Sequence, residues 1–470
     1  MSLAQFVRFS LLTHRLSRPI RWSPEKLARI QRVRLRRLVR NTVRSSAFFA
    51  NKFRGIDADR CELTDLPPSR KDELMANFDA IVTDPLVRRT EVERFIGNPN
   101  NLGQWFLGRY AVSHTSGSQG SPLLIVQDRR CLEIAFAIMS SRAKPGGQIG
   151  VGEGIKRLWS PARLAVVTTG RGFYPSGAAF EFMPELVGPY VRVLRLSSQQ
   201  PDLIERLNEF QPEILVAYAS VLEALACQAD RLRLTGLKEV ANNSEELSPR
   251  AMRRIRQALC VNVLDHYGAG ECLFLSEGCR TDGGAHVNAD WAILEVVDDD
   301  YRAVPAGQTG SKVLITNLAN MVQPFIRYEI GDRLTMASEP CGCGNRLPRI
   351  AQIDGRAAEL FWVAENGRFR FLSGVLFHGA ADSLQDVREW QAIQVDRNRI
   401  EVRLQLLPGS KLTSDTARDG FLATAKASGL PATVEVNVRL VEAVEADSAN
   451  GKFRRMVSRV GPPPEVIGKV

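Results

Sequence analysis

Cysteine is scarce in this sequence, with eight among 470 residues. So few thiols exclude a small domain held together by disulfides. Residues 1–18 are basic and partly apolar, but Arg8 interrupts the apolar stretch and no small-residue cleavage site follows. We therefore expect no secretion signal and a cytoplasmic protein, whose thiols are free or bind a metal.

Long apolar runs are also missing. Arg, Glu or Gly interrupts every stretch that approaches the roughly 18 to 20 residues needed to cross a bilayer. We therefore expect a chain that does not span a membrane. Its 44% hydrophobic and 24% charged residues are typical of a globular protein, and 470 residues predict two or more domains.

Acidic residues are outnumbered, which leaves a formal net charge of +10. Much of the excess lies in one stretch, at Arg29, Arg32, Arg34, Arg36, Arg37, Arg40 and Arg44. Ser23, Pro24 and Glu25 form a good helix start, and the apolar residues after them recur at helical spacing. We interpret the stretch as an amphipathic surface helix with its arginines mostly in solvent. Peripheral contact with anionic lipid is the alternative, whereas no motif or aromatic interleaving indicates nucleic acid.

The central part of the chain alternates between short apolar strands and helical segments. Strands are predicted at 123–126, 164–168, 213–217 and 261–265, and helices at 131–142 and 220–231. Such alternation predicts an α/β layered body. From Ala292 onward, longer extended pieces with glycine turns predict a β-rich appendage to that body.

A second unit is expected after Gly355-Arg356. Residues 400–407 and 433–441 alternate apolar and polar side chains, and 414–427 has helical spacing. About 110 residues suffice for an independent small domain. We therefore predict a large N-terminal body at residues 1–355 and a small α+β domain at 356–470.

A loop rich in glycine and hydroxyl groups precedes the first of these strands. It reads Ser113-His114-Thr115-Ser116-Gly117-Ser118-Gln119-Gly120-Ser121-Pro122. Its glycines leave backbone N–H groups free to surround phosphate oxygens, and its hydroxyls add donors. No Lys-Ser or Lys-Thr follows Gly120, so it is not a Walker A loop. The loop predicts a triphosphate site, with an exposed Ser/Gly turn as the alternative.

Three later segments each place a charged side chain on a loop that contains glycine. They read Asp265-His266-Tyr267-Gly268-Ala269-Gly270-Glu271, Phe325-Ile326-Arg327-Tyr328-Glu329-Ile330-Gly331-Asp332 and Asn450-Gly451-Lys452-Phe453-Arg454-Arg455. The first follows a predicted strand, where α/β sheets place ligands. Taken singly, each has a plain alternative: a surface acid at Glu271, a turn former at Asp332 and a solvated lysine at Lys452.

Together, in this order, the four segments resemble the acyl-adenylate-forming superfamily, most closely its phenylacetate–coenzyme A ligase and capsule-protein-like branch. The resemblance covers nearly the whole chain. It includes the early arginine-rich helix and residues 211–220, which are similar to a central strand-turn-helix of that branch. It implies a large N-terminal body and a small, mobile C-terminal domain that rotates between two half-reactions.

The resemblance also implies a role for each matching residue. Glu271 should bind Mg²⁺ and Asp332 the ribose hydroxyls, and Arg356 should bind the nucleotide after domain movement. Lys452 should reach the carboxylate and the α-phosphate as charge develops there. Phosphate contacts are implied for Thr115, Ser116, Gly117, Ser118, Gln119 and Gly120, and contacts around the adenine for Ser244, Glu245, Tyr267 and Gly268.

A structural Zn²⁺ is predicted at Cys279, His286, Cys341 and Cys343. Six residues separate Cys279 from His286 across a glycine turn, and only Gly342 separates Cys341 from Cys343. Four such ligands complete a tetrahedral sphere and leave no open position for catalysis. The branch often carries similar Cys/His positions. There are two alternatives: Cys272 is the ligand in place of Cys279, or the thiols bind no metal.

The sequence departs from the family pattern at three places. Ser121 stands where many relatives have lysine, Glu329-Ile330 replaces the usual Arg-Thr, and Ala358-Glu359 replaces the hinge acids. The first two lie near the expected nucleotide and would lower activity. The third concerns the hinge that the second half-reaction needs. The resemblance therefore supports adenylation more strongly than thioester formation with coenzyme A.

We therefore expect an enzyme that uses ATP to convert a carboxylic acid to an acyl-adenylate, with release of pyrophosphate. The acyl group would then pass to coenzyme A, an amine, a hydroxyl or a carrier protein. The alternatives are a non-catalytic relative that binds a nucleotide or partner, and a peripheral membrane-binding protein. The acid should lie between Tyr218, Asn242 and Tyr267; the family branch alone favours an aromatic acid.

Overall fold

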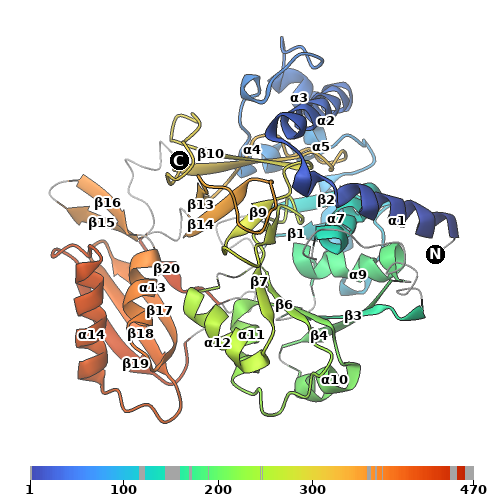
Figure 1. Ribbon diagram of the computed structural model, residues 1–470. Helices are drawn as coiled ribbons and strands as arrows, with labels where there is room; N and C mark the ends of the chain where they lie inside the picture. Colours follow the sequence, from blue (N-terminus) through green and yellow to red (C-terminus); the bar gives the residue numbers. More distant parts are fainter. Residues whose placement is uncertain are drawn as a thin grey trace.

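The computed structural model describes most of the chain. The described residues are 3–115, 122–142, 159–168, 172–188, 190–198, 200–243, 245, 247–356, 361–365, 368–372, 374–444 and 453–460. Figure 1 shows a larger N-terminal body, blue through yellow to orange, which includes the described residues up to Arg356, and a smaller orange to red C-terminal unit, formed by the described residues from Phe361 onward. Among these residues no helix is both long and apolar enough to cross a membrane.

Helices form most of the first part of the body. They are α1 (Leu3–Leu16), α2 (Pro24–Ser45), α3 (Ala47–Lys52), α4 (Lys71–Ala76), α5 (Phe78–Ile81) and α6 (Arg89–Ile96). The predicted start of α2 is confirmed, because the Ser23 side chain accepts a hydrogen bond from the Lys26 N–H. The basic face of α2 is mostly exposed but partly neutralised within the chain: Arg32 and Arg36 pair with Glu62.

A five-stranded parallel sheet forms the centre of the body, in the order β4-β3-β5-β6-β7. Its strands are β3 (Ala162–Thr168), β4 (Val191–Ser197), β5 (Ile214–Ala217), β6 (Glu239–Asn242) and β7 (Asn262–Asp265). The accompanying helices are α7 (Arg129–Arg142), α9 (Pro175–Val187), α10 (Leu203–Phe210), α11 (Ala219–Ala226) and α12 (Pro249–Leu259). The antiparallel hairpin of β1 (Tyr110–His114) and β2 (Leu124–Asp128) lies beside α7 and α9 (Figure 1). The predicted α/β body is confirmed.

The predicted β-rich appendage is also present. One sheet has the order β13-β14-β9-β8 and the other the order β10-β11-β12. Their strands are β8 (Ser276–Gly278), β9 (Ala285–Val287), β10 (Ala292–Val297), β11 (Lys312–Asn317), β12 (Tyr328–Ile330), β13 (Asp332–Met336) and β14 (Arg349–Arg356). The buried pair Arg142–Asp290 (2.8 Å) joins α7 to the segment before β10, which ties the appendage to the central layer.

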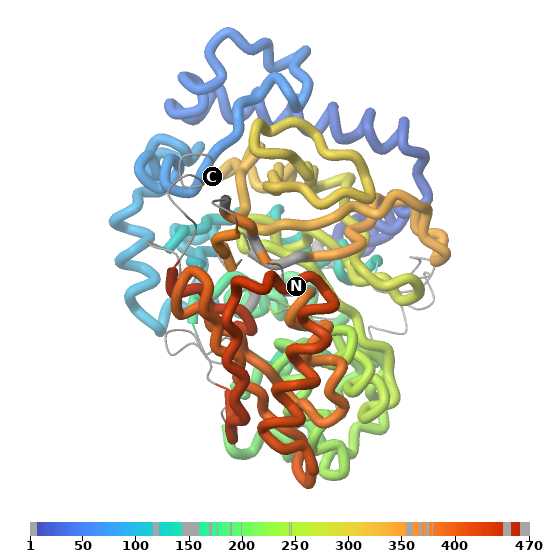
Figure 2. Tube along the Cα trace, turned by 90° about the vertical axis from the view of Figure 1, so that its left-hand side faces the viewer, coloured from blue at the N-terminus to red at the C-terminus, as the bar shows by residue number. Residues whose placement is uncertain are grey.

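The C-terminal unit has a hydrophobic core of its own, centred on Phe361, Phe377, Trp390 and Phe421. Its main sheet has the order β19-β18-β17-β20, and β15 and β16 form a separate hairpin. The elements are β15 (Phe361–Glu365), β16 (Arg368–Leu372), α13 (Gly374–Asp382), β17 (Val387–Asp396), β18 (Arg399–Leu406), α14 (Ser414–Ala427), β19 (Glu435–Val441) and β20 (Met456–Ser458). Figures 1 and 2 both show this unit beside the light-green helices of the body.

Candidate active site and candidate metal centre

The carboxyl ends of three central strands lie at one edge of the sheet. The register pairs Ala217 with Asn242 and Asn242 with Asp265. The segments that follow these residues, which hold Glu245 and Tyr267, therefore emerge together. This is the edge at which open parallel sheets bind ligands.

Tyr267 and Asp332 meet directly at this edge. The Tyr267 hydroxyl donates to Oδ2 of Asp332 at 2.6 Å, and the tyrosine residue is 9% exposed. Ser276 fixes the tyrosine backbone, because its Oγ accepts from the Tyr267 N–H at 3.0 Å and donates to the Tyr267 carbonyl at 2.7 Å. Asp332 begins β13 and stands opposite Arg356 of β14 in the strand register. Three of the predicted nucleotide residues are thus brought together.

Glu271 lies on the glycine-containing loop after β7 and is 7% exposed. Its carbonyl accepts from the Asn317 side chain at 2.7 Å, which fixes the loop against β11. A Cβ atom at Gly270 would come within 2.8 Å of Ile125 and of Pro175, so only glycine permits this approach. Because Ile125 belongs to β2, the Glu271 loop packs against the hairpin that carries the expected phosphate loop.

Thr115 closes the base of that phosphate loop. Its N–H donates to the Leu123 carbonyl, and its Oγ1 accepts from the Leu123 N–H, both at 3.0 Å. The predicted phosphate residues Ser116, Gly117, Ser118, Gln119 and Gly120 lie outside the described residues, as do Ser244 and Lys452.

Glu245 connects the body to the C-terminal unit. One carboxylate oxygen accepts from the Ser220 N–H at 3.0 Å, at the start of α11, and the other from the Phe453 N–H at 3.2 Å. Phe453 directly follows Lys452. Asn242, which sequence reasoning placed only near the acid pocket, supports this junction: its Nδ2 donates to the Glu245 carbonyl at 2.7 Å and to Asp265 Oδ1 at 2.6 Å.

The buried acid Glu277 pairs with the half-buried His266, which directly precedes Tyr267 in the chain. Nδ1 of His266 is 3.2 Å from Glu277 Oε2 and accepts from the Gly278 N–H at 3.1 Å. Burial lowers the pKa of His266 to about 4 and raises the pKa of Glu277 to about 8. At neutral pH the proton therefore resides on Glu277, and His266 is neutral. Sequence reasoning missed Glu277 because only the fold places it beside His266.

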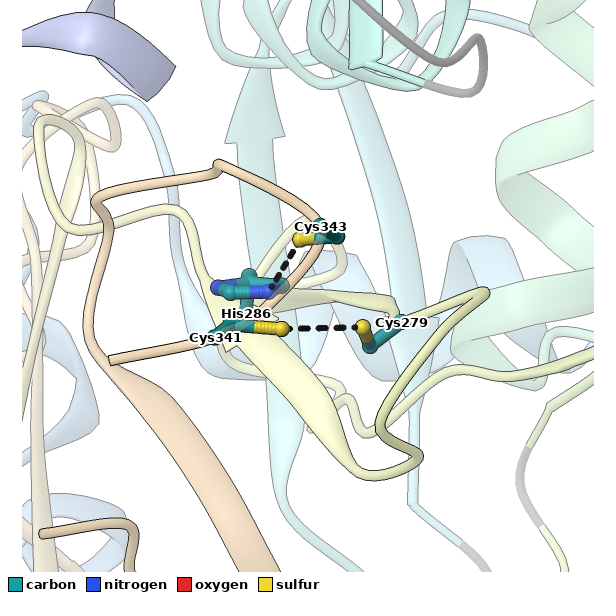
Figure 3. A group of neighbouring side chains, drawn as sticks. All are labelled: Cys279, His286, Cys341 and Cys343. Carbon is teal, nitrogen blue, oxygen red and sulfur yellow. Dashed lines mark hydrogen bonds between the residues drawn. The ribbon is translucent and has the colours of Figure 1, made fainter. Parts of the chain in front are cut away.

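The four predicted zinc ligands converge (Figure 3). Their ligand atoms all lie within 4.8 Å of one another. Sγ of Cys279 is 3.4 Å from Sγ of Cys341, and Sγ of Cys343 is 3.3 Å from Nε2 of His286. Three thiols and one imidazole nitrogen at such separations fit a tetrahedral zinc sphere. Cys272, the alternative ligand, is fully buried in the hydrophobic core of the body and is not in this group.

The surroundings fix these ligands in place. His286 Nδ1 is 3.0 Å from the Leu347 carbonyl, which leaves Nε2 to face the thiols. Asp282 Oδ2 accepts from the Gly342 N–H at 2.6 Å and so holds the Cys341 loop against the β8–β9 turn. In that turn, Gly284 has a φ of +68°, and a Cβ there would lie 2.1 Å from the Ile350 carbonyl oxygen. Only glycine allows the turn to lie this close to β14.

No known protein-family profile matches the chain. A curated protein, the phenylacetate–coenzyme A ligase of Thermus thermophilus, is 24% identical over 360 residues, which cover 72% of each chain. A 2-hydroxyisobutyryl-CoA ligase in its postadenylation state superposes with a TM-score of 0.72 at 18% identity, over 96% of this chain and 92% of that one.

The chain has the fold of the acyl-adenylate-forming superfamily. The predicted adenylate-forming fold is thereby confirmed. The same 2-hydroxyisobutyryl-CoA ligase in its thioesterification state gives a TM-score of 0.59 at 20% identity, over 94% of this chain and 91% of that one. An amide bond synthetase of Marinactinospora thermotolerans gives 0.52 at 15% identity, over 72% and 67%.

Proposed function

We propose that this protein activates a carboxylic acid with ATP, forming an acyl-adenylate and releasing pyrophosphate. One observation carries the proposal. The Glu245–Phe453 hydrogen bond docks the segment next to Lys452 onto the sheet edge where Tyr267 and Asp332 meet. A domain-borne cation and a nucleotide-binding edge are the two parts that adenylation needs.

The chemistry follows from the charges involved. Attack of a carboxylate on the α-phosphate brings two anions together, so alignment and charge neutralisation matter more than a general base. Lys452 would supply a positive charge at the reacting oxygens when the C-terminal unit is docked. The Tyr267 ring would lie against the adenine, and Asp332 would bind the ribose hydroxyls. Thr115 to Gly120 would contact the phosphates, and Arg356 would bind the nucleotide after domain movement.

A magnesium ion fits the carboxylate of Glu271. Mg²⁺ prefers hard oxygen ligands and usually takes one or two protein carboxylates beside phosphates and water. When bound, the ion would neutralise charge on the phosphates. The Asn317 contact and the close packing of Gly270 hold the Glu271 backbone in place for this role.

We also propose a structural zinc at Cys279, His286, Cys341 and Cys343. All four ligand positions come from the protein, so the ion would be closed to substrate. The Cys341 loop connects β13 to β14, the strands that carry Asp332 and Arg356. The zinc would therefore stiffen the strands beneath the nucleotide site. We also propose that the boundary between the two domains lies at Gly355-Arg356, because β14 ends there.

The acceptor of the acyl group is proposed to be coenzyme A or an amine. Support comes from relatives of the same fold named as a coenzyme A ligase and as an amide bond synthetase. A carrier protein is a further candidate. The acceptor can be identified by supplying each candidate together with ATP and the acid that the protein activates. The measurement is which candidate becomes acylated.

Acid-dependent exchange of pyrophosphate into ATP tests the proposed activity. A panel of arylacetic, benzoic, hydroxy and fatty acids should contain at least one that supports exchange. The competing function is a nucleotide-binding protein without catalysis, which the altered motifs at Ser121 and Glu329-Ile330 motivate. Saturable ATP binding with no exchange for any acid would establish that alternative.

A further inference from the structure

Two arginines of α12 contact the C-terminal unit. Arg250 and Arg254 are four residues apart and so lie on one face of the helix. They donate to five backbone carbonyls, which are those of Ala381, Leu384 and Gln385 for Arg250 and of Val387 and Arg388 for Arg254. Arg254 reaches its two acceptors at 3.0 and 2.7 Å. These acceptors span the last turn of α13 and the start of β17, so the contact is specific to one orientation of the unit.

A bridging cluster of four charged side chains adjoins this contact: Glu223, Arg254, Glu389 and Arg455. Glu223 of α11 pairs with Arg254 of the body through Oε1, and its Oε2 is 3.6 Å from Arg455. Arg455 in turn forms two 2.9 Å hydrogen bonds with the two carboxylate oxygens of Glu389, in its own unit. Glu223 therefore lies between one arginine from each side.

Three members of the bridging cluster are buried, Arg254 is half-buried, and the four ionised side chains balance in charge. The Glu223 and Arg455 side chains are only 8% and 6% exposed. Burial, followed by the nearby Glu389 carboxylate, raises the pKa of Glu223 to about 7, and the two arginines oppose this effect. Buried ion pairs contribute little net stability but penalise arrangements that leave a charge unpaired. The bridging cluster should therefore select an orientation of the unit rather than stabilise the whole fold.

The selected orientation controls the segment that carries Lys452. Arg455 is three residues beyond Lys452, and Phe453 is one residue beyond it and donates to Glu245 of the body. The segment is thus anchored at two points on the body, and both depend on the docked orientation. The chain also has the higher TM-score, 0.72 against 0.59, with the postadenylation state of the 2-hydroxyisobutyryl-CoA ligase.

We propose that Glu223, Arg250 and Arg254 are positioning residues that hold the C-terminal unit, and with it Lys452, in the orientation used for acid activation. This inference rests on the proposed function. It predicts that removing the contact impairs the first half-reaction, pyrophosphate release, but not the second. Pyrophosphate release needs the docked orientation, whereas consumption of a preformed acyl-adenylate does not.

The first test measures both half-reactions in the full chain with Arg250→Ala and Arg254→Ala combined. Acid-dependent pyrophosphate release should fall by about tenfold or more, with transfer from a preformed acyl-adenylate within about twofold of the parent. Glu223→Gln, which keeps the side-chain volume, should give a smaller change in the same direction. Arg253→Ala with Arg256→Ala is the matched control, because both side chains are exposed on the same helix. Equal loss in both half-reactions would overturn the proposal.

The second test needs no acid and therefore distinguishes failure of this inference from failure of the proposed function. Hydrogen exchange should become at least about tenfold faster at Phe453 and across 381–388 in the Arg250→Ala/Arg254→Ala chain. Exchange in β17 beyond Trp390 and in β18 should stay unchanged, which shows that the C-terminal unit remains folded. Unchanged protection at Phe453 would overturn the positioning role. If the double variant does not fold, Glu223→Gln is measured in its place by the same criterion.

Discussion

The Tyr267 hydroxyl donates a hydrogen bond to Asp332 Oδ2 at 2.6 Å, although the two are 65 positions apart in the sequence. The bond joins the loop after β7 to the first residue of β13. It orients a carboxylate that is proposed to bind the ribose, and it places an aromatic ring beside that carboxylate. The proposed nucleotide site therefore depends on a contact between the central sheet and the β-rich appendage.

Tyr267→Phe keeps the ring and removes this bond. We expect nucleotide affinity to fall about threefold to tenfold, since a hydrogen bond to a charged group contributes about 1.5 to 3 kcal/mol and part of that is recovered from water. Asp332→Ala should weaken binding further. Titration calorimetry with ATP measures both. Tyr110→Phe is the matched control, because it removes a 2.6 Å bond to Asp84 at the end of β1 away from the phosphate loop; an equal loss in that control would refute a specific role.

Glu271→Gln should weaken the use of Mg²⁺-ATP while acid binding stays largely unchanged. The amide keeps the shape of the side chain but loses the charge that a hard cation prefers. Pyrophosphate exchange as a function of magnesium concentration should shift to higher concentrations by about tenfold or more. The exposed Glu205→Gln serves as control. A variant with the parent's magnesium dependence would remove Glu271 from the metal site.

Protein purified without added metal should contain about one equivalent of zinc. Cys279→Ser should lose the ion and lower both the thermal midpoint and nucleotide affinity, because the Cys341 loop joins β13 to β14. Cys227→Ser, at an exposed free thiol, should change neither. Elemental analysis decides the matter: less than about a tenth of an equivalent of zinc, with freely titrating thiols at Cys279, Cys341 and Cys343, would exclude the site.

Glu277 should make stability fall as pH rises toward 8. An ordinary glutamate has a pKa of about 4.3 in the unfolded chain, and burial raises it to about 8 in the folded protein. A group whose pKa is raised by folding stabilises the fold fully at pH values below its pKa in the unfolded chain. This contribution is lost as the pH rises through its pKa in the folded protein. Between pH 6.5 and 8 the free energy of unfolding should fall by up to about 1.4 kcal/mol per pH unit from this group. Chemical denaturation should show a flatter profile for Glu277→Gln than for Glu205→Gln; parallel profiles would contradict the assignment.

Local signals in the sequence predicted much of the fold. The Ser23 cap and the helical spacing after it located α2, and buried apolar runs located β3 and β5. The helix predicted at 220–231 ends earlier, at Ala226. The side chain of Asn208 holds the chain after the helix in a turn, because it donates a hydrogen bond to the Arg231 carbonyl and accepts one from the Arg233 N–H.

Contacts between distant segments were beyond sequence reasoning. The motifs indicated Tyr267 and Asp332 one by one, but their contact depends on strand order and register. The Cys/His cluster that is proposed to bind zinc was predictable because the spacing of its residues is short on each side of the site. Glu223, Arg254 and Glu277 carry no sequence signal, since each gains its significance only from burial beside a partner from another element.

Lys452→Ala is the sharpest test of whether this protein forms an acyl-adenylate. The parent protein and the variant are each assayed with ATP, magnesium and an acid that supports exchange. A preformed acyl-adenylate is supplied to both proteins in parallel. We predict that acid-dependent pyrophosphate exchange falls on the order of 10²-fold or more, while transfer from the acyl-adenylate continues near the parent rate. Equal loss of both half-reactions, or exchange that persists at the parent rate without Lys452, would contradict it.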